Sequence, residues 1–317
     1  MQMSPVTLLA VGAAHLDRRA RSAVPFRQGA SNPGVVTETV GGSVLNAALA
    51  MRRFGATVRL CSGRGGDAAG ERVEEALEAA GILDHSFVWL DRATATYTAV
   101  LDDRGDLVAG IADMAIYDLL GKRVLRQRQM RAAMAECDAL IVDANLSGPT
   151  VGALLERFDG RPTAAIAVSP SKALNLALHL GRLSAVFLSR AEAAAIVEMT
   201  AATDIVRLAQ FLGEMGAVRA VITDGPQEVA ILELGSVRLQ APPAVSHLRD
   251  VTGAGDTLAG VAFRAYVGGV AFDRAVRLGM AAASRRISAE AEDARGIVEA
   301  IVSIAETMAP HRTAKPV

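Results

Sequence analysis

The chain has 317 residues, with 33 Lys and Arg against 34 Asp and Glu, and a formal net charge of -1. This length accommodates one large α/β domain with an appendage, or two ordinary domains. The balanced charge gives no electrostatic reason to expect nucleic acid or an anionic membrane as a partner, so a small molecule is the expected ligand. Apolar residues make up 51% of the chain but aromatic residues only 4%, a composition typical of helices packed on a parallel sheet.

Neither a disulfide framework nor a membrane span is predicted. Only two cysteines, Cys61 and Cys137, occur, each in an apolar context, and both are expected to be reduced core residues of a cytoplasmic protein. No segment has the roughly 18 uninterrupted apolar residues that a span requires. The stretch V-T-L-L-A-V-G-A-A is followed by basic residues, the reverse of a signal peptide, and predicts a buried first strand.

Apolar runs of strand length alternate with helical patterns along most of the chain. In order, the patterns predict a strand at 6–12, a helix at 43–54 ended by Gly55, a strand at 57–61 and a helix at 67–80 ended by Gly81. Further strands are predicted at 139–143, 164–168, 185–188 and 220–223, each before a helix-compatible segment. This alternation predicts right-handed crossovers and a doubly wound, mainly parallel α/β sheet flanked by helices.

Two stretches interrupt this alternation. Residues 17–40 are polar, contain proline and lack helical period, whereas residues 94–110 alternate like paired strands around D-D-R-G, a turn signal. Surface loops are one interpretation. Two β-like excursions from an α/β sheet also suit a small β lid, contributed by roughly 17–40 and 94–114, that would exclude water from a reactive site.

The stretch D-V-T-G-A-G-D-T (250–257) opens a helical pattern and raises a question of chemistry. A helix start presents unpaired N–H groups and partial positive charge, so it is suited to bind an anion. Gly253 and Gly255 would let the backbone approach such a ligand closely. Asp256, in the first turn, would then accept a proton from a hydroxyl that attacks phosphorus. From these residues alone, simple capping by Asp256 is an equally open interpretation.

A second motif settles the preference between these interpretations. V-G-G-S-V-L-N-A-A-L-A-M-R-R-F-G-A (40–56) and D-V-T-G-A-G-D-T-L-A-G (250–260) together resemble the N-terminal and C-terminal signatures of the PfkB carbohydrate kinase family, the ribokinase-like sugar and nucleoside kinases. The resemblance extends to about residue 288. It implies a ribokinase-like fold in a single domain spanning 1–317, and it favours catalysis over capping for Asp256.

Further stretches are most similar to the pseudouridine kinases within that family. They are G-A-S-N-P-G (29–34), T-Y-T-A-V-L-D-D-R-G-D-L-V-A-G-I-A-D-M-A-I-Y-D (96–118), and V-D-A-N-L-S (142–147) followed by V-S-P-S-K-A (168–173). The resemblance implies that Asp256 is the catalytic base and that the anion hole is formed by Gly253, Ala254 and Gly255. It assigns contacts with the acceptor substrate to Asp17, Asn32, Gly41, Gly42 and Asn46.

The same resemblance implies a nucleotide site with two departures from the family pattern. Glu192 would help to hold Mg²⁺ and phosphate through water, but Ser189 stands where the family has Asn. Thr223 and Gly225 fit a turn for the nucleotide phosphates, but Glu228 replaces the usual second glycine. Both departures affect the expected response to metal and nucleotide.

Three assignments stay open at this stage. Asp250 either helps to hold a monovalent cation such as K⁺ or only caps its turn. His15, close to Asp17, either contacts substrate or is structural, the more common role for one histidine on a strand. The segment 288–296 is more charged than expected near a nucleotide base, and no adenine contacts are assigned to it.

The predicted function is an ATP- and Mg²⁺-dependent kinase that phosphorylates the 5'-hydroxyl of a nucleoside, with pseudouridine as the first candidate. Another nucleoside or a free sugar is the alternative, because Asp17 and Asn46 would recognise only the sugar. A non-catalytic nucleoside-binding protein is a third possibility, to which Ser189 and Glu228 give some room. The resemblance also implies a homodimer formed through the lid, since an exposed β edge invites pairing.

Overall fold

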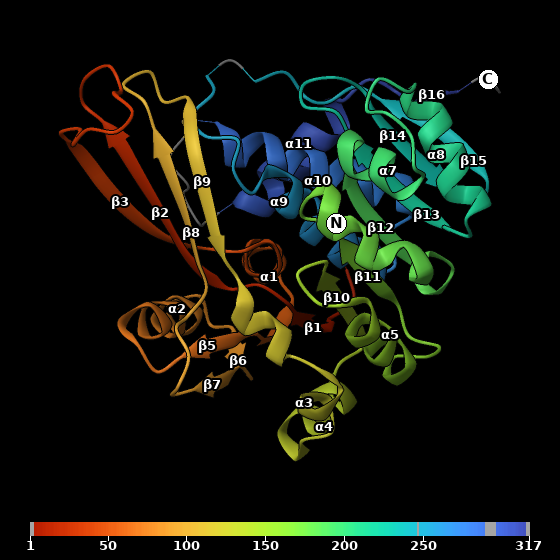
Figure 1. Ribbon diagram of the computed structural model, residues 1–317. Coiled ribbons are helices and arrows are strands. Elements are labelled where there is room, and N and C mark those ends of the chain that lie inside the picture. Colours follow the sequence, from red (N-terminus) through yellow and green to blue (C-terminus); the bar gives the residue numbers. More distant parts are fainter. Residues whose placement is uncertain (1–2, 246, 289–295, 315–317) are drawn as a thin grey trace.

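The computed structural model describes residues 3–245, 247–288 and 296–314, and its centre is a ten-stranded sheet (Figure 1). The strand order is β16-β15-β14-β13-β12-β11-β10-β1-β4-β6. Strands β6 to β13 along this order are parallel, and β14, β15 and β16 extend the edge antiparallel. The bounds are β1 Thr7–Val11, β4 Thr57–Cys61, β6 Leu83–Asp84, β10 Ala139–Asp143, β11 Thr163–Ile166, β12 Ala185–Ser189, β13 Arg219–Thr223, β14 Val229–Glu233, β15 Ser236–Gln240 and β16 Arg312–Thr313.

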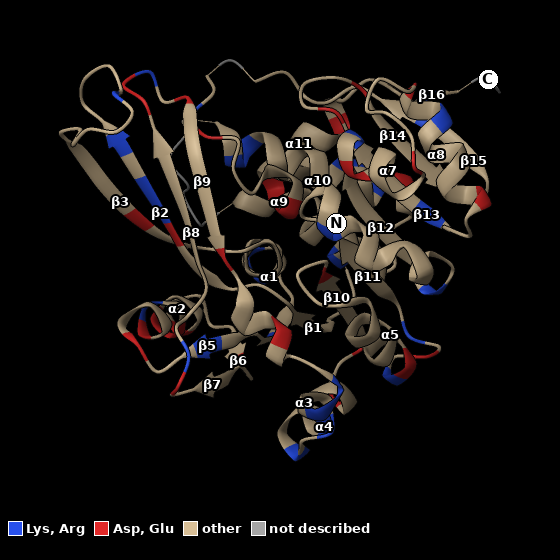
Figure 2. Cartoon of the chain, viewed as in Figure 1, with Lys and Arg blue, Asp and Glu red and all other residues tan. Residues whose placement is uncertain are grey.

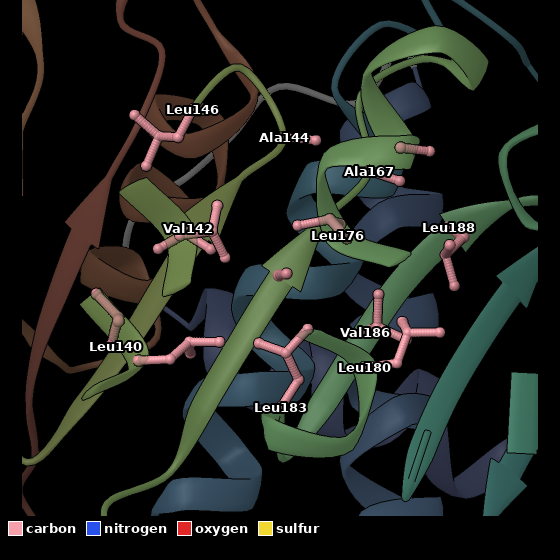
Figure 3. Packing of buried hydrophobic residues seen from close by; sticks show 14 of the residues in the cluster. Leu140, Val142, Ala144, Leu146, Ala167, Leu176, Leu180, Leu183, Val186 and Leu188 are labelled. Atoms are coloured by element: carbon pink, nitrogen blue, oxygen red, sulfur yellow. The ribbon is translucent and has the colours of Figure 1, made fainter. Parts of the chain in front are cut away.

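Helices cover both faces of this sheet, which is why its central strands are apolar on both sides. Alternate residues of β1 point to opposite faces: Leu8 packs with one buried cluster and Leu9 with the other. Helices α1, α9 and α10 contribute to the first cluster, and α4, α5, α7 and α8 to the second, part of which Figure 3 shows. The helices are α1 Ser43–Arg53, α2 Ala68–Ala79, α3 Lys122–Leu125, α4 Arg128–Ala135, α5 Gly148–Arg157, α6 Pro170–Ala173, α7 Arg190–Ile196, α8 Ile205–Glu214, α9 Ala254–Val267, α10 Phe272–Ile287 and α11 Ile297–Thr307.

A small four-stranded sheet, of order β3-β2-β8-β9, projects from one side of this body (Figure 1). Its strands are β2 His15–Ser22, β3 Gly34–Gly41, β8 Thr96–Leu101 and β9 Leu107–Asp113. The two interrupting stretches of the sequence therefore pair with each other, with Asp17 opposite Thr39 and Tyr97. Paired strands rather than loops occupy them. The minor elements are a two-stranded sheet of β5 Gly63–Gly65 and β7 Phe87–Trp89, and the 3-10 helices η1 Ala115–Leu119 and η2 Leu174–Arg182.

Most predicted boundaries agree with the structure, and the exceptions have local causes. Gly55 and Gly81 follow α1 and α2 with positive φ of 82° and 66°, as predicted for helix ends. Strand β11 ends at Ile166 rather than 168, because Val168 adopts a positive φ of 72°. The hairpin β14–β15 was not predicted. Its two-residue turn is Leu234-Gly235, and Leu gives no turn signal.

Cys61 and Cys137 are free and buried, as predicted. Among the residues that the structure describes, no helix is long and apolar enough to cross a membrane. The charged segment noted at 288–296 lies, except for its two end residues, outside the described residues.

Candidate active site

Helix α9 begins at the carboxyl-end edge of the central sheet, where ligands bind in open α/β folds. Its N-cap residue Gly253 has a φ of 74°, a left-handed conformation that favours glycine. The N–H of Ala254 donates to the carbonyl of Val251 at 3.2 Å. The first intrahelical bond runs from the N–H of Thr257 to the carbonyl of Gly253 at 2.9 Å. The N–H groups of Gly255 and Asp256 therefore precede the helical ladder and are available to an anion.

The carboxylate of Asp256 lies in the first turn of this helix and meets the side chain of Asn46 from α1. Asn46 Nδ2 donates to Asp256 Oδ2 at 3.0 Å, which joins residues 210 positions apart. Burial raises the pKa of Asp256 from 3.8 to about 6, helped by the charges of Asp143 and Glu192 and opposed by hydrogen bonds from Asn46 and Ser43. A carboxyl group with this pKa is suited to exchange a proton near neutral pH.

The raised pKa predicts a specific effect on stability. Because the folded protein binds this proton more tightly than the unfolded chain, the ionised carboxylate costs stability that returns as pH falls from above 6 toward 4. At pH 8 we expect the free energy of unfolding of Asp256→Asn to be about 3 kcal/mol higher than that of wild type. Urea titrations at pH 8 and pH 4.5 measure this difference, which should shrink at the lower pH. A difference that grows on acidification would contradict the assigned pKa.

Asp17, Gly41 and Asn46, three of the residues assigned to the acceptor, line a second cavity of about 480 Å³ together with other residues of β2, β3 and α1. A Cβ on Gly41 would collide with Oδ2 of Asp17. The Asp17 carboxylate can therefore occupy this position only because residue 41 has no side chain. Gly42 has a φ of 119° and faces the carbonyl of Ala13 at the start of α1, where a Cβ would also collide. Its part is therefore in the local backbone packing.

His15 is buried and positions Asp17. Its Nε2 lies 3.1 Å from Asp17 Oδ1, and its Nδ1 lies 3.2 Å from the hydroxyl of Tyr117. Both ring nitrogens are thus occupied by protein groups. Of the two roles left open for this histidine, the geometry favours the structural one.

Two predicted residues already bond to other protein groups in the structure. Asn32 is half-buried in the β2–β3 connection, where its side chain bonds only to the backbone of Arg27 and Ala30 among the described residues. The carboxylate of Asp250 accepts from Arg19 Nη1 at 3.0 Å and from the N–H of Thr252 at 2.9 Å. These bonds, and the charge of Arg19, lower the pKa of Asp250 against the opposing effect of its partial burial. A guanidinium therefore already neutralises the proposed cation ligand.

Sequence reasoning missed the most buried carboxylate of the site, Asp143 at the end of β10. Its Oδ2 accepts from the N–H groups of Ala13 at 2.9 Å and Val44 at 3.2 Å, and its Oδ1 accepts from the N–H of Asn145 at 3.0 Å. Burial raises its pKa, although these hydrogen bonds oppose the shift. Asp143 thereby ties β10 to the loop after β1 and to the start of α1, on which Asn46 stands.

Lys172 and Asn145 were also missed, although their stretches carried part of the resemblance. Lys172 Nζ donates to Asn145 Oδ1 beside Asp143. Burial lowers the pKa of Lys172, and the charges of Asp143 and Asp118 oppose this shift. A polar group thus follows β10 and β11 at the same edge of the sheet as Asp256.

Three of the four predicted nucleotide residues, Ser189, Glu192 and Thr223, line a smaller cavity of about 320 Å³ together with Asp256, whereas Gly225 is not among its lining residues. Ser189 is the N-cap of α7, and it forms a capping box with Glu192: the Ser189 N–H donates to Glu192 Oε2 at 2.7 Å. Local capping therefore accounts for the serine. Gly225 has a φ of 56°, as a turn glycine does, whereas Glu228 pairs with Arg312 at the antiparallel edge.

This smaller cavity is chemically suited to Mg²⁺ with a phosphorylated ligand. Mg²⁺ in such sites takes one or two carboxylates and fills its other positions with water and phosphate oxygens. Glu192 supplies one such carboxylate, and Gly255 at the start of α9 lines the same cavity. Across the three described ranges, no group of three or more His, Cys, Asp or Glu side chains lies close enough together to bind a metal ion by itself.

Comparisons with known proteins identify the family and the fold. The family profile of the pfkB carbohydrate kinases matches residues 7–294. The chain is 24% identical over 283 residues to the pseudouridine kinase of Escherichia coli, a match that covers 88% of this chain and 90% of that protein.

A solved carbohydrate kinase from Agrobacterium tumefaciens is 35% identical with a TM-score of 0.86, covering 98% of this chain and 100% of that one. Arabidopsis thaliana ribokinase, solved with ribose and ATP, has a TM-score of 0.79 at 17% identity over 96% and 99% of the two chains, which shows a shared fold. This protein belongs to the pfkB family of carbohydrate kinases.

Proposed function

We propose that the protein transfers the γ-phosphoryl group of ATP to the 5'-hydroxyl of a nucleoside, with pseudouridine as the first candidate. The position of Asp256 carries this proposal. Its carboxylate lines the smaller cavity, and its hydrogen-bond partner Asn46 lines the larger one. A base between two cavities is the arrangement that transfer between two ligands requires.

In this proposal each group of the chain has one task. Asp256 takes the proton of the acceptor hydroxyl as its oxygen attacks phosphorus, and the N–H groups of the 253–256 turn stabilise charge on the phosphoryl oxygens. Asp17 and Asn46 hold the sugar hydroxyls through directional hydrogen bonds. Glu192 would help to hold Mg²⁺ through water, and the ion neutralises phosphate charge when it is bound.

We further propose that the small sheet is a lid and that Arg19 fastens it. Arg19, on β2, donates to Asp250 at 3.0 Å and to the hydroxyl of Thr252 at 2.6 Å, directly before the anion-binding turn. This contact also favours a structural role for Asp250 over K⁺ binding. The neighbouring Arg18 instead pairs with Glu38 within the small sheet, whose charged strands appear in Figure 2.

Arg19→Ala is expected to raise KM for the acceptor about fivefold or more, because one charge-assisted contact that holds the lid closed is lost. Stability should change by less than about 1 kcal/mol, since the two side chains are 39% and 44% exposed. Steady-state kinetics and thermal unfolding measure the two effects. Arg19→Lys should recover part of the loss and Arg18→Ala should leave KM unchanged, whereas equal effects of Arg18→Ala and Arg19→Ala would refute the fastening role.

The choice of acceptor rests on similarity to a pseudouridine kinase at 24% identity, so kinetic discrimination is the appropriate test. A coupled ADP-release assay would compare pseudouridine, uridine, adenosine, ribose and fructose 6-phosphate. We expect the highest kcat/KM for pseudouridine. Turnover of pseudouridine no better than that of ribose would transfer the assignment to another nucleoside or a sugar. If no acceptor turns over while nucleosides still raise the melting temperature, a binding protein is the better description.

The exposed face and edge of the small sheet support a homodimer. Val35 and Val36 on β3 and Ile111 on β9 expose 65%, 63% and 67% of their surface, and β9 is a free edge within the small sheet. Apolar side chains on an edge strand favour pairing with a second copy. The two buried free thiols are compatible with a cytoplasmic location, which we propose as well.

Ile111→Lys is expected to convert this dimer largely to monomer at micromolar concentration, because a charge would enter the apolar contact. Light scattering coupled to size-exclusion chromatography measures the mass. Leu178→Lys is the matched control, since Leu178 on η2 is 92% exposed but lies outside the small sheet. Monomeric wild-type protein at the same concentration would rule the dimer out.

A further inference from the structure

The larger cavity has a strongly basic wall that the proposed transfer chemistry does not use. Five arginines from four separate parts of the chain line it: Arg19, Arg53, Arg249, Arg285 and Arg286. Among the described residues, the carboxylates that line it with them are those of Asp17 and Asp250. By contrast, neither Lys nor Arg is among the described residues that line the smaller cavity. The two cavities on either side of Asp256 and Asn46 thus differ in charge.

Neither of these carboxylates is paired with Arg249 or Arg286. Asp17 is paired with His15, and Asp250 with Arg19. Within residues 3–245, 247–288 and 296–314, the guanidinium groups of Arg249 and Arg286 have no hydrogen-bond or ion-pair partner. A concave site with such a wall concentrates positive potential.

The basic wall begins at the acceptor site itself. A Cβ placed on Gly253 would lie 3.1 Å from Asn46 Nδ2 and 3.3 Å from Arg286 Nη2, so the guanidinium and the amide flank the same point of the anion-binding turn. The floor of the cavity is apolar, with Phe54, Val261 and Ile301 buried beneath it. A ligand there would rest on hydrocarbon and face guanidinium groups along its rim.

We propose that this cavity is a subsite for a carboxylate or phosphate group, next to the acceptor hydroxyl. The forked donors of arginine match the two oxygens of such groups, and an apolar floor strengthens the attraction. The anion has two possible sources: a substituent of the acceptor itself, or a separate small anion beside a neutral nucleoside. The first source rests on the proposed kinase function and narrows its acceptor to an acidic nucleoside or sugar.

Uridine and orotidine test the first source, because they differ only in the carboxylate on the base. We expect kcat/KM for orotidine to be at least tenfold higher than for uridine, because one charge-assisted hydrogen bond to the carboxylate contributes about that factor. Arg249→Gln should lower the orotidine-to-uridine ratio about tenfold. Arg52→Gln is the matched control, since Arg52 also lies on the surface but bonds to the carbonyl of Gly81, outside the cavity. Its ratio should equal that of wild type.

Thermal unfolding in inorganic phosphate, without nucleotide or acceptor, tests the second source. Phosphate should raise the melting temperature of wild type and Arg52→Gln by the same amount, and that of Arg249→Gln by clearly less. If phosphate stabilises the protein in this Arg249-dependent way but orotidine is not preferred over uridine, the cavity binds a separate anion. No orotidine preference together with equal stabilisation of Arg249→Gln would overturn the subsite.

The two proposals fail in different ways. Arg249-dependent stabilisation by phosphate without turnover of any acceptor would retain the subsite and refute the kinase assignment. Turnover of pseudouridine with no response to either anion probe would refute the subsite and retain the kinase assignment.

Discussion

Asp256→Asn is expected to lower kcat about a thousandfold, because an amide cannot take the proton of the attacking hydroxyl. The fold should persist, since Asn46 can still donate to the amide oxygen that replaces Asp256 Oδ2. In wild type, kcat/KM should fall as pH drops through the Asp256 pKa of about 6, because the protonated carboxyl is not a base. ADP-release kinetics between pH 5 and 9 measure both effects.

Asp273→Asn provides the matched control, because Asp273 also stands in the first turn of a helix, α10, but lies outside both cavities. Its kcat should equal that of wild type. If Asp256→Asn retained the wild-type rate, the mechanism would be wrong, and capping would be the role left for this carboxylate.

Asp143→Ala is expected to give a large loss of stability, about 3 kcal/mol or more, because it leaves buried N–H groups without acceptors. The N–H groups of Ala13, Val44 and Asn145 all depend on this carboxylate. Gly12 lies directly against the Asp143 carboxyl group, since a Cβ on Gly12 would come within 2.5 Å of the carboxyl carbon. Because Gly12 has no side chain, it cannot fill the space that the lost carboxyl group leaves. Urea unfolding measures the change.

Asp138→Ala tests whether this loss depends on burial. Asp138 precedes the same strand and accepts from the N–H of Thr7 at 2.8 Å, but this bond is exposed. Water can replace an exposed acceptor, so its loss should cost less than about 1 kcal/mol. Similar losses in both variants would show that Asp143 does not anchor the site.

The fold was largely predictable because its central strands are short, apolar and separated by helical patterns. Strands β1, β10 and β12 follow this rule, since helices cover both faces of the sheet. The β14–β15 hairpin breaks it. Two strands there follow each other through Leu234, whose φ of 50° is a conformation that leucine rarely adopts. Local sequence gives no warning of that turn.

The site was predictable where its chemistry is local. The glycines and Asp256 stand within one helix start, and the physics of helix ends identified them. The Ser189–Glu192 capping box was visible as S-x-x-E but was interpreted only through the resemblance. Asp143 and Arg19 act on partners 130 and 231 positions away. One sequence carries no information about such pairings, so these contacts and the basic cavity emerged only from the fold.

The central claim is that the protein transfers the γ-phosphoryl group of ATP to a nucleoside hydroxyl, with Asp256 as the base. Its most direct test is to incubate the protein with Mg²⁺, pseudouridine and ATP that carries ¹⁸O in its γ-phosphoryl group, and to locate the label by ³¹P NMR. The account predicts a phosphate ester on the 5' oxygen with wild type and almost none with Asp256→Asn. Label recovered only as ATP or inorganic phosphate, across the panel of acceptors, would contradict it.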